Sequence, residues 1–315
     1  MDKVPANEGP PARTMFSAII ATVRPNQWVK NLFVFGPLLF SHRLSDITTD
    51  LRAVAGFVLF CLAASAVYIV NDLMDLQLDR QHPTKRLRPV ASGEINRKTA
   101  VTVAVLLALV TTAGSLALGG VFTALILGYV VLNVSYSLGL KQVVIIDVMM
   151  IGAGFVLRVL AGAAAIHVSP SHWLVLCTIL LSVFLGFTKR RAELTLLNEK
   201  AAEHRKVLTS YSPVFLDQMI SVATATTLMC YILYTVDART VNSVAGGSRG
   251  LLLTVPFVMY GIFRYLYLVY RQEKGGSPTT ALLHDRMMLL SVALWTLLCV
   301  AVIYFPEHFK GWFSK

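Results

Sequence analysis

The chain has 315 residues, of which 56% are hydrophobic and only 14% are charged. Soluble domains usually carry about 25% charged residues, so this composition excludes an ordinary soluble protein. Several apolar runs approach the ~20 residues that a helix needs to cross a bilayer. No segment between them is long enough to fold as a separate soluble domain. We therefore expect one all-α domain of a polytopic membrane protein.

The net charge of +11 could indicate a nucleic-acid partner, but the cations lie in short loops between apolar runs and form no basic–aromatic block. We therefore expect the membrane bilayer, and no nucleic acid, as a partner. The four cysteines lie inside apolar runs without CxxC spacing, which is typical of small buried side chains: Cys61, Cys177, Cys230 and Cys299.

The apolar runs predict nine transmembrane helices. The first predicted span is the weakest because it is short and contains Pro37. The third and fourth meet at Leu118 and the Gly119-Gly120 turn, which predicts a tight helical hairpin. In domain terms we expect a polar cytoplasmic tail at 1–23, the transmembrane domain at 24–306 and a short tail at 307–315. The predicted spans are 26–41, 51–72, 99–117, 119–137, 143–166, 172–189, 213–236, 250–270 and 287–305.

Lysine and arginine predict the orientation of the chain in the membrane. Most of them fall in loops that are cytoplasmic if the N-terminus is inside, which is the usual bias of multi-pass proteins. We therefore expect an inner (plasma) membrane protein with a cytoplasmic N-terminus. The longest polar loops follow the second and sixth spans on that side, so we expect the chemistry at the cytoplasmic face.

The first polar cluster in chain order opens the first predicted span, in the segment RPNQWVKN (24–31). Arg24 and Lys30 flank Trp28 there. Cations beside a tryptophan are also typical of an ordinary anchor at the membrane surface. The cluster is therefore a candidate substrate-binding element, and a membrane-surface anchor is the alternative.

The most specific feature is the segment NDLMDLQLD (71–79), at the inner end of the second predicted span. At ~100° per residue, Asn71, Asp75 and Asp79 step round a helix by only about 40° each. Asp72 falls beside them. Carboxylates on one face repel one another unless a cation neutralises them, and Mg²⁺ prefers such oxygen ligands. We predict that these four side chains bind Mg²⁺; a solvated acidic helix end is the alternative.

A loop rich in cations follows at once, with the sequence RQHPTKRLRP (80–89). Its two prolines restrain the backbone and so fix the directions of the cations. Metal-binding carboxylates followed by fixed cations are typical of a diphosphate site. We predict that Lys85, Arg86 and Arg88 bind phosphate groups. Topology signalling would explain the charge, but not the neighbouring aspartates.

Two more polar groups lie around the fifth predicted span. Tyr136 and Lys141 belong to the connection that precedes it. Asp147 and Arg158 lie on one face of the span but roughly 16 Å apart, too far to pair directly. An arginine in mid-span points by default to a polar cavity. A structural partner on another helix is the alternative.

The sixth predicted span ends in KRRAEL (189–194). Its three cations are candidates for binding phosphate, with topology signalling as the alternative. Glu193 is the nearest acid, and the sequence leaves open whether it meets metal or sugar. No Gly-rich phosphate loop, nucleophile elbow or HExxH motif occurs in the chain. We therefore expect metal-assisted displacement rather than covalent catalysis.

These motifs together resemble the UbiA superfamily of intramembrane prenyltransferases. NDxxDxxxD (71–79) is similar to that family's first Asp-rich motif, and YSLGLK (136–141) resembles the element that follows its fourth span. Aromatic prenyltransferases of the family carry a second DxxxD motif after the sixth span. Residues 189–200 contain no aspartate, which is a clear departure from that pattern.

The full set of motifs resembles one branch of the superfamily, the decaprenyl-phosphate phosphoribosyltransferases. The set comprises RPxQWxKN, NDxxDxxxDRxHPTKRxRP, YSxxLK, Asp147 with Arg158, and KRxAEL. The resemblance implies transfer of 5-phosphoribose from phosphoribosyl diphosphate to a polyprenyl phosphate, with Mg²⁺ as cofactor and diphosphate as product. In that branch the reaction feeds arabinan synthesis for the cell wall.

The resemblance also suggests residue roles. Asp75 and Asp79, with Asn71 and Asp72, would hold the metal against the donor diphosphate. Lys30, Lys141 or Arg158 would orient the lipid phosphate, and we count Asp72, Asp75, Asp79, Lys30 and Arg158 as catalytic candidates. The substrate-binding candidates are Arg24, Lys85, Arg86, Arg88, Tyr136, Lys141, Asp147, Lys189, Arg190, Arg191 and Glu193.

Two alternatives come from other reactions or classes of protein. A prenyltransferase acting on an aromatic or other acceptor would also carry the first Asp-rich motif. The second Asp-rich motif of such enzymes is missing from this chain, which argues against this alternative. A transporter would spread polar residues across the bilayer, whereas here they gather at one face. The sequence leaves the oligomeric state open, and an oligomer is possible.

Overall fold

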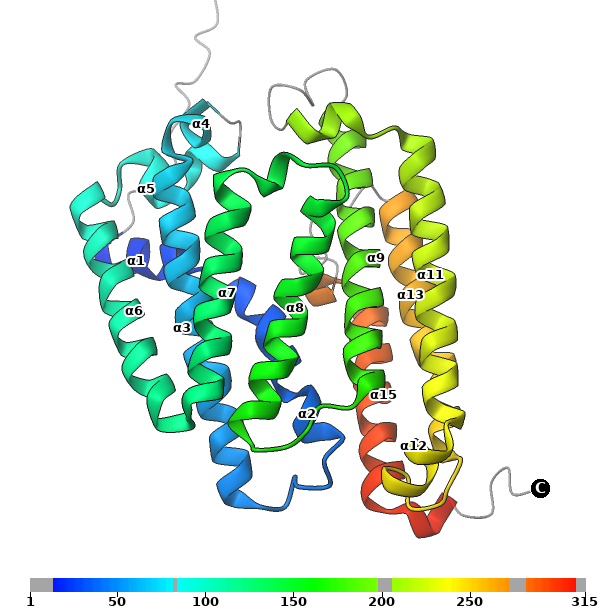
Figure 1. Cartoon of the computed structure of the whole chain (residues 1–315). Coiled ribbons are helices and arrows are strands. Elements are labelled where there is room, and N and C mark those ends of the chain that lie inside the picture. Colours follow the sequence, from blue (N-terminus) through cyan, green and yellow to red (C-terminus); the bar gives the residue numbers. More distant parts are fainter. Residues whose placement is uncertain (1–13, 82–83, 198–205, 272–281, 310–315) are drawn as a thin grey trace, which may run out of the picture.

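Eight long apolar helices run side by side through the protein (Figure 1). The computed structural model describes residues 14–81, 84–197, 206–271 and 282–309, and all regular structure within these ranges is helical. The predicted tails at 1–13 and 310–315 lie outside them. The eight helices are α3 (Ile47–Met74), α6 (Arg97–Leu118), α7 (Gly120–Leu138), α8 (Ile146–Ala165), α9 (His172–Leu197), α11 (Pro213–Val236), η6 with α13 (Gly250–Thr254, Val255–Arg271) and α15 (Arg286–Tyr304).

These eight helices are long and apolar enough to cross a membrane, which confirms the later eight predicted spans and a multi-pass membrane protein. Local chemistry sets several of their boundaries. The Asp46 side chain accepts from Thr48 N–H at the start of α3, and that of Asn96 accepts from Thr99 N–H at the start of α6. Gly119, with φ +122°, makes the tight turn between α6 and α7 that the sequence predicts.

The first predicted span is helical but irregular. Residues Pro25–Phe35 form a 3₁₀ helix, η1, and Gly36–Leu39 form the short α2. At about 2.0 Å per residue, the eleven residues of η1 extend roughly 22 Å. Polar side chains help to hold this segment against the neighbouring helices. It packs against α3 and α8, where Trp28 donates to Ser65 Oγ at 3.0 Å and Asn31 donates to Cys61 Sγ at 3.2 Å.

Short elements close the two ends of the bundle (Figure 1). At the end that carries the acidic motif lie α4 (Leu76–Gln81) and α5 (Pro89–Ser92), with η2 (Lys85–Leu87) packed against both. Helix α1 (Met15–Val23) packs against α3 and α5, so part of the predicted polar tail is helical. Near the opposite end lies α12 (Ala238–Ser243). The other short segments are η3 (Leu140–Gln142), η5 (Lys206–Ser210) and η8 (Pro306–Phe309).

The buried side chains form separate clusters rather than one core. One cluster joins α3, α7 and α8 around Phe60, Phe122 and Tyr129. A second joins α8, α9, α11 and α13 around Phe184 and Tyr265. Helix α8 contributes to both, so it carries its polar residues between the two halves of the bundle.

At Gly162 of α8 the backbone of η1 approaches closely. A Cβ atom at this position would lie 2.0 Å from the Val34 carbonyl oxygen, which is backbone and has little freedom to move aside. We predict that Gly162→Ala separates η1 from α8 and lowers the thermal stability in detergent by several degrees, equivalent to about 2 kcal/mol or more.

Gly128 of α7 is the matched control, since no atom lies within 4 Å of a Cβ built there. Gly128→Ala should leave the melting temperature unchanged or raise it slightly, because alanine favours a helix by about 1 kcal/mol over glycine. Equal melting temperatures for the two variants would contradict the close approach.

Candidate functional site

The acidic motif spans a break between two helices. Helix α3 ends at Met74, Asp75 lies at the break, and α4 begins at Leu76. The backbone bonds nevertheless continue, from Asp75 N–H to the Asn71 carbonyl at 2.9 Å and from Asp79 N–H to the Asp75 carbonyl at 2.8 Å. Asn71, Asp75 and Asp79 are therefore spaced one helical turn apart, as the sequence predicts.

Arginines from two other segments neutralise the buried aspartates. Arg24 Nη2 lies 2.6 Å from Asp72 Oδ2, and Arg88 Nη1 bridges Asp79 Oδ2 at 2.6 Å and Asp72 Oδ1 at 3.0 Å. The side chains of Asp72 and Asp79 are only 4% and 3% exposed. Arg24 has left-handed backbone torsion angles (φ 57°) between α1 and η1. The backbone therefore changes direction at Arg24, the residue that pairs with Asp72.

The cation loop also supplies Lys85, whose Nζ lies 4.0 Å from Asp79 Oδ1. Partial burial lowers the pKa of the Lys85 ammonium, while the nearby Asp79 carboxylate acts in the opposite direction. Arg86 is exposed on the same short segment. The loop therefore lies beside the acidic motif, as predicted. Arg88 makes the shortest contacts between the loop and the aspartates.

Asp75 faces a different partner. Lys141 of η3 lies 3.0 Å from Asp75 Oδ1 and 3.3 Å from Oδ2. One turn earlier in the motif, Asn71 Oδ1 accepts from Ser137 Oγ at 2.7 Å. The Asp75 side chain is 35% exposed, so it is the most accessible of the three carboxylates. The connection between α7 and α8 therefore forms the second wall of the site.

Arg190 is the centre of a buried network at the end of α9. Its Nε lies 2.7 Å from Asp147 Oδ2, and both side chains are fully buried. Its guanidinium also pairs with Glu193 and donates to Tyr136 Oη at 3.3 Å. Asp147 Oδ1 accepts in turn from Tyr211 Oη at 2.7 Å. Glu193 belongs to this network and also lies near Lys189. The network therefore fixes the predicted phosphate-binding residues at the end of α9.

Arg158 has structural partners on neighbouring segments. It donates to Asn31 Oδ1 at 2.8 Å, to the Gly154 carbonyl at 2.8 Å and to Tyr129 Oη at 3.0 Å. Its guanidinium also lies within 5.4 Å of the ring centres of Phe60, Tyr129 and Phe155. None of these contacts is to a carboxylate. The alternative that Arg158 has a structural partner on another helix therefore matches the geometry.

The remaining predicted cations divide between two surroundings. Lys30 has no hydrogen-bond or ion-pair partner among the described residues, and the charges acting on it are those of Arg158 and Arg24. It also acts on Lys189, which lies 3.8 Å from Glu193. Arg191 instead pairs with Asp217 at 2.9 Å and lies over the Tyr270 ring. Its contacts are thus separate from those of the acidic motif.

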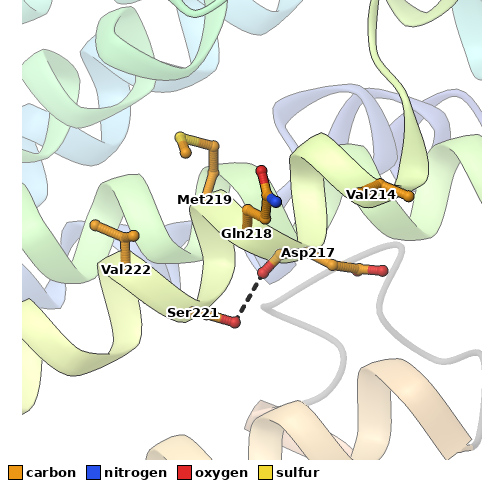
Figure 2. A pocket seen from close by; sticks show the side chains of 6 residues that line it. All are labelled: Val214, Asp217, Gln218, Met219, Ser221 and Val222. Carbon is orange, nitrogen blue, oxygen red and sulfur yellow. Dashed lines mark hydrogen bonds between the residues drawn. The ribbon is translucent and has the colours of Figure 1, made fainter.

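Asp217 also borders a shallow hollow along α11, lined by Val214, Asp217, Gln218, Met219, Ser221 and Val222 (Figure 2). Ser221 donates to the Asp217 carbonyl at 2.9 Å across one turn of the same helix. One helix supplies every lining residue, and none belongs to the acidic motif. We therefore assign no role to this hollow.

Four residues that complete the site were not among the predicted site residues. Two of them, Asn31 and Ser137, lie inside the polar segments RPNQWVKN and YSLGLK, so their positions carried a usable signal. Tyr129 lies within an apolar predicted span, and no motif around it marks it as a site residue. Tyr211 stands alone in a connecting segment, and only the fold shows that it reaches Asp147.

The donor set suits a hard divalent cation. Asn71, Asp75 and Asp79 present oxygen atoms from successive turns, and Asp75 is accessible. Within the ranges that the structure describes, no three His, Cys, Asp or Glu side chains are gathered as a ready metal cage. The aspartates contact cations instead. A metal would therefore need oxygen ligands from a phosphate substrate as well, which is how Mg²⁺ is commonly held.

Comparison with known proteins gives one family from the sequence and a shared fold from solved structures. Residues 32–284 match the UbiA prenyltransferase family. The chain is 34% identical over 303 residues to the decaprenyl-phosphate phosphoribosyltransferase of Corynebacterium glutamicum, covering 95% of this chain and 90% of that one. It is 33% identical over 309 residues to the enzyme of the same name from Mycolicibacterium smegmatis, covering 94% and 95%.

A solved structure of a UbiA homologue from Archaeoglobus fulgidus, bound to GPP and Mg²⁺, shares the fold with a TM-score of 0.68. The two chains are 17% identical, and the match covers 91% of this chain and 99% of that one. At this identity the likeness concerns the fold.

Successive arginines of α9 provide a matched pair for testing the buried network. We predict that Asp147→Asn lowers the stability by about 3 kcal/mol, because it removes the fully buried one of the two carboxylates that pair with the buried Arg190. Asp217→Asn breaks the pair with Arg191, in which the side chains are 22% and 41% exposed, and should cost less than about 1 kcal/mol.

Thermal melting in detergent measures both variants. A melting temperature for Asp147→Asn no lower than that for Asp217→Asn would show that the Arg190 pair contributes no more than a surface pair.

Proposed function

The chain belongs to the UbiA prenyltransferase family, and within it we propose that this enzyme transfers 5-phosphoribose from phosphoribosyl diphosphate to a polyprenyl phosphate, releasing diphosphate. The observation that carries the proposal is the gathering of four cations from three segments around one acidic motif: Arg24, Lys85, Arg88 and Lys141. A site with several phosphate groups to bind needs this surplus of positive charge. Near full-length identity to the two named phosphoribosyltransferases supports the same reaction.

The donor diphosphate would bind at the acidic motif. Asn71, Asp75 and Asp79 would hold Mg²⁺, and bound Mg²⁺ would stabilise the negative charge of the leaving diphosphate. Arg88 and Lys85 are close enough to Asp79 to reach phosphate oxygens on the same ligand. Asp72, paired with both Arg24 and Arg88, would hold these two arginines in place.

The lipid phosphate would bind at Lys30. Of the three residues that the sequence offers for this role, Lys141 contacts Asp75, and Arg158 is surrounded by Asn31, Tyr129 and aromatic rings. Lys30 is half-buried beside other cations, and no acid in the described part of the chain contacts it. A buried cation of this kind is stabilised by an anionic ligand.

The reaction then needs few further groups. A lipid phosphate oxygen attacks C1 of the ribose as the bond from C1 to the diphosphate oxygen breaks. The attacking phosphate is already an anion, so no general base is required. The fixed cations neutralise the charge that moves onto the departing diphosphate, which is electrostatic stabilisation of the transition state. The bias of Lys and Arg in the loops supports the cytoplasmic face as the side on which these events occur.

Prenyl transfer from a polyprenyl diphosphate to an aromatic or other acceptor is the competing reaction. The homologue bound to GPP and Mg²⁺ supports it, because the fold accommodates a prenyl diphosphate in that protein. The absence of a second Asp-rich motif after the sixth span argues against it in this chain.

We expect purified protein in detergent to convert radiolabelled phosphoribosyl diphosphate and polyprenyl phosphate into a labelled lipid. EDTA should abolish the product, and added Mg²⁺ should restore it. Asp75→Asn and Asp79→Asn should each lower the rate by about 100-fold or more, since each removes charge that the metal requires. Label in the organic extract measures the product.

Asp237→Asn is the matched control, because Asp237 caps α12 near the opposite end of the bundle and asparagine caps a helix equally well. It should keep wild-type activity. Transfer of a prenyl group to a phenolic acceptor, with no ribosylated lipid, would decide for the competing reaction.

Lysine variants should separate the two substrates. We predict that Lys30→Met raises KM for polyprenyl phosphate about tenfold and leaves KM for the donor nearly unchanged, while Lys85→Met does the reverse. Loss of one hydrogen bond to a charged group costs about 1.5 kcal/mol or more, which corresponds to about tenfold in affinity. Steady-state kinetics with each substrate varied in turn measures the split; parallel changes in both KM values would refute the separate sites.

A further inference from the structure

The connection between α7 and α8 contains a strained turn. Ile145 has φ +69° and ψ −45°, and Ile146 N–H donates to the Val144 carbonyl at 2.8 Å across it. This is a γ-turn of the rare form with positive φ, which is strained for any L residue and most of all for a β-branched one. Such a conformation persists only where surrounding contacts hold it.

One phenol contacts both sides of this turn. Tyr211 Oη accepts from the Ile145 N–H at 2.7 Å and donates to Asp147 Oδ1 at 2.7 Å. The Tyr211 side chain is buried, and its ring stacks on Phe215 with 5.9 Å between centroids. Burial and the Asp147 carboxylate raise the pKa of this phenol, so it keeps the proton that it donates.

The turn lies between two groups of site residues. Before it, η3 carries Lys141, which pairs with Asp75. After it, the first turn of α8 carries Asp147, which pairs with Arg190 and so fixes the end of α9. The direction of the backbone at Ile145 therefore sets how Lys141 stands relative to Arg190. Of these residues, Asp147 is the one that bonds directly to Tyr211.

We propose that Tyr211 is a positioning residue for the donor site, whose hydroxyl holds the Ile145 turn and thereby the relative placement of Lys141 and Arg190. The proposal rests on the proposed function for its kinetic consequence. Its structural part, the hold on residues 140–146, stands independently of the reaction.

Tyr211→Phe removes only the hydroxyl and keeps the stacked ring. We expect KM for phosphoribosyl diphosphate to rise about tenfold, with KM for polyprenyl phosphate within about twofold of wild type. Amide hydrogen exchange should accelerate about tenfold in a peptide covering 140–146. Adding Ile145→Gly should recover part of the donor KM, because glycine adopts positive φ without strain.

Tyr231→Phe is the matched control. Its buried hydroxyl also has two partners, accepting from Trp295 Nε1 at 2.7 Å and sharing a bond of 2.6 Å with Thr254 Oγ1, in a different cluster. It should lower the melting temperature similarly but leave the donor KM and the exchange of 140–146 unchanged. If both variants lose activity in proportion to stability, or if the donor KM of Tyr211→Phe stays within twofold of wild type, the positioning role is overturned.

Hydrogen exchange in the wild-type protein needs neither activity nor a folded variant. We expect the Ile145 amide to be protected although it lies outside a helix. An unprotected amide overturns the hold on the turn. A protected amide in a protein that transfers no phosphoribose overturns the proposed reaction and leaves the hold in place.

Discussion

Charged groups carried out of water must find opposite charges, and this requirement organises the site end of the bundle. Asp72, Asp79, Asp147 and Arg190 are buried, and each lies against a partner from another segment of the chain. Breaking one pair leaves an uncompensated charge, which costs far more than the intact pair contributes. The pairs therefore act chiefly as constraints. They hold α1, α3, α4, α8 and α9 in one relative arrangement at the site.

The same constraint separates two kinds of cation. Arg24, Arg88, Lys141 and Arg190 have carboxylate partners, so their positions are fixed in the protein alone. Lys30 has none among the described residues, and aromatic rings and neutral oxygens surround Arg158. Fixed cations suit a substrate that must be oriented for reaction, whereas a cation without a partner favours the arrival of an anion.

Much of the fold was predictable because the bilayer imposes a length and a composition on each span. Eight spans are confirmed, along with the hairpin at Gly119. The irregular form of 26–41 was not predictable, since it depends on Gly162 admitting the Val34 backbone from a distant helix. Likewise, the sequence placed acids and cations at one face but could not assign their pairs. Arg88 meeting both Asp72 and Asp79, or Tyr211 meeting Asp147, follows from packing between segments far apart in the chain.

The arrangement of charge around the acidic motif also bears on the order in which ligands bind. Three aspartates there stand against Arg24, Lys85, Arg88 and Lys141, so the cluster is already slightly electropositive. A bare divalent ion would add charge of the sign already in excess, and it would compete with Arg88 for Asp79. A divalent ion carried by a polyanionic diphosphate brings net negative charge instead. For the proposed reaction, electroneutrality therefore favours entry of metal and donor as a single complex, with little occupancy by the metal alone.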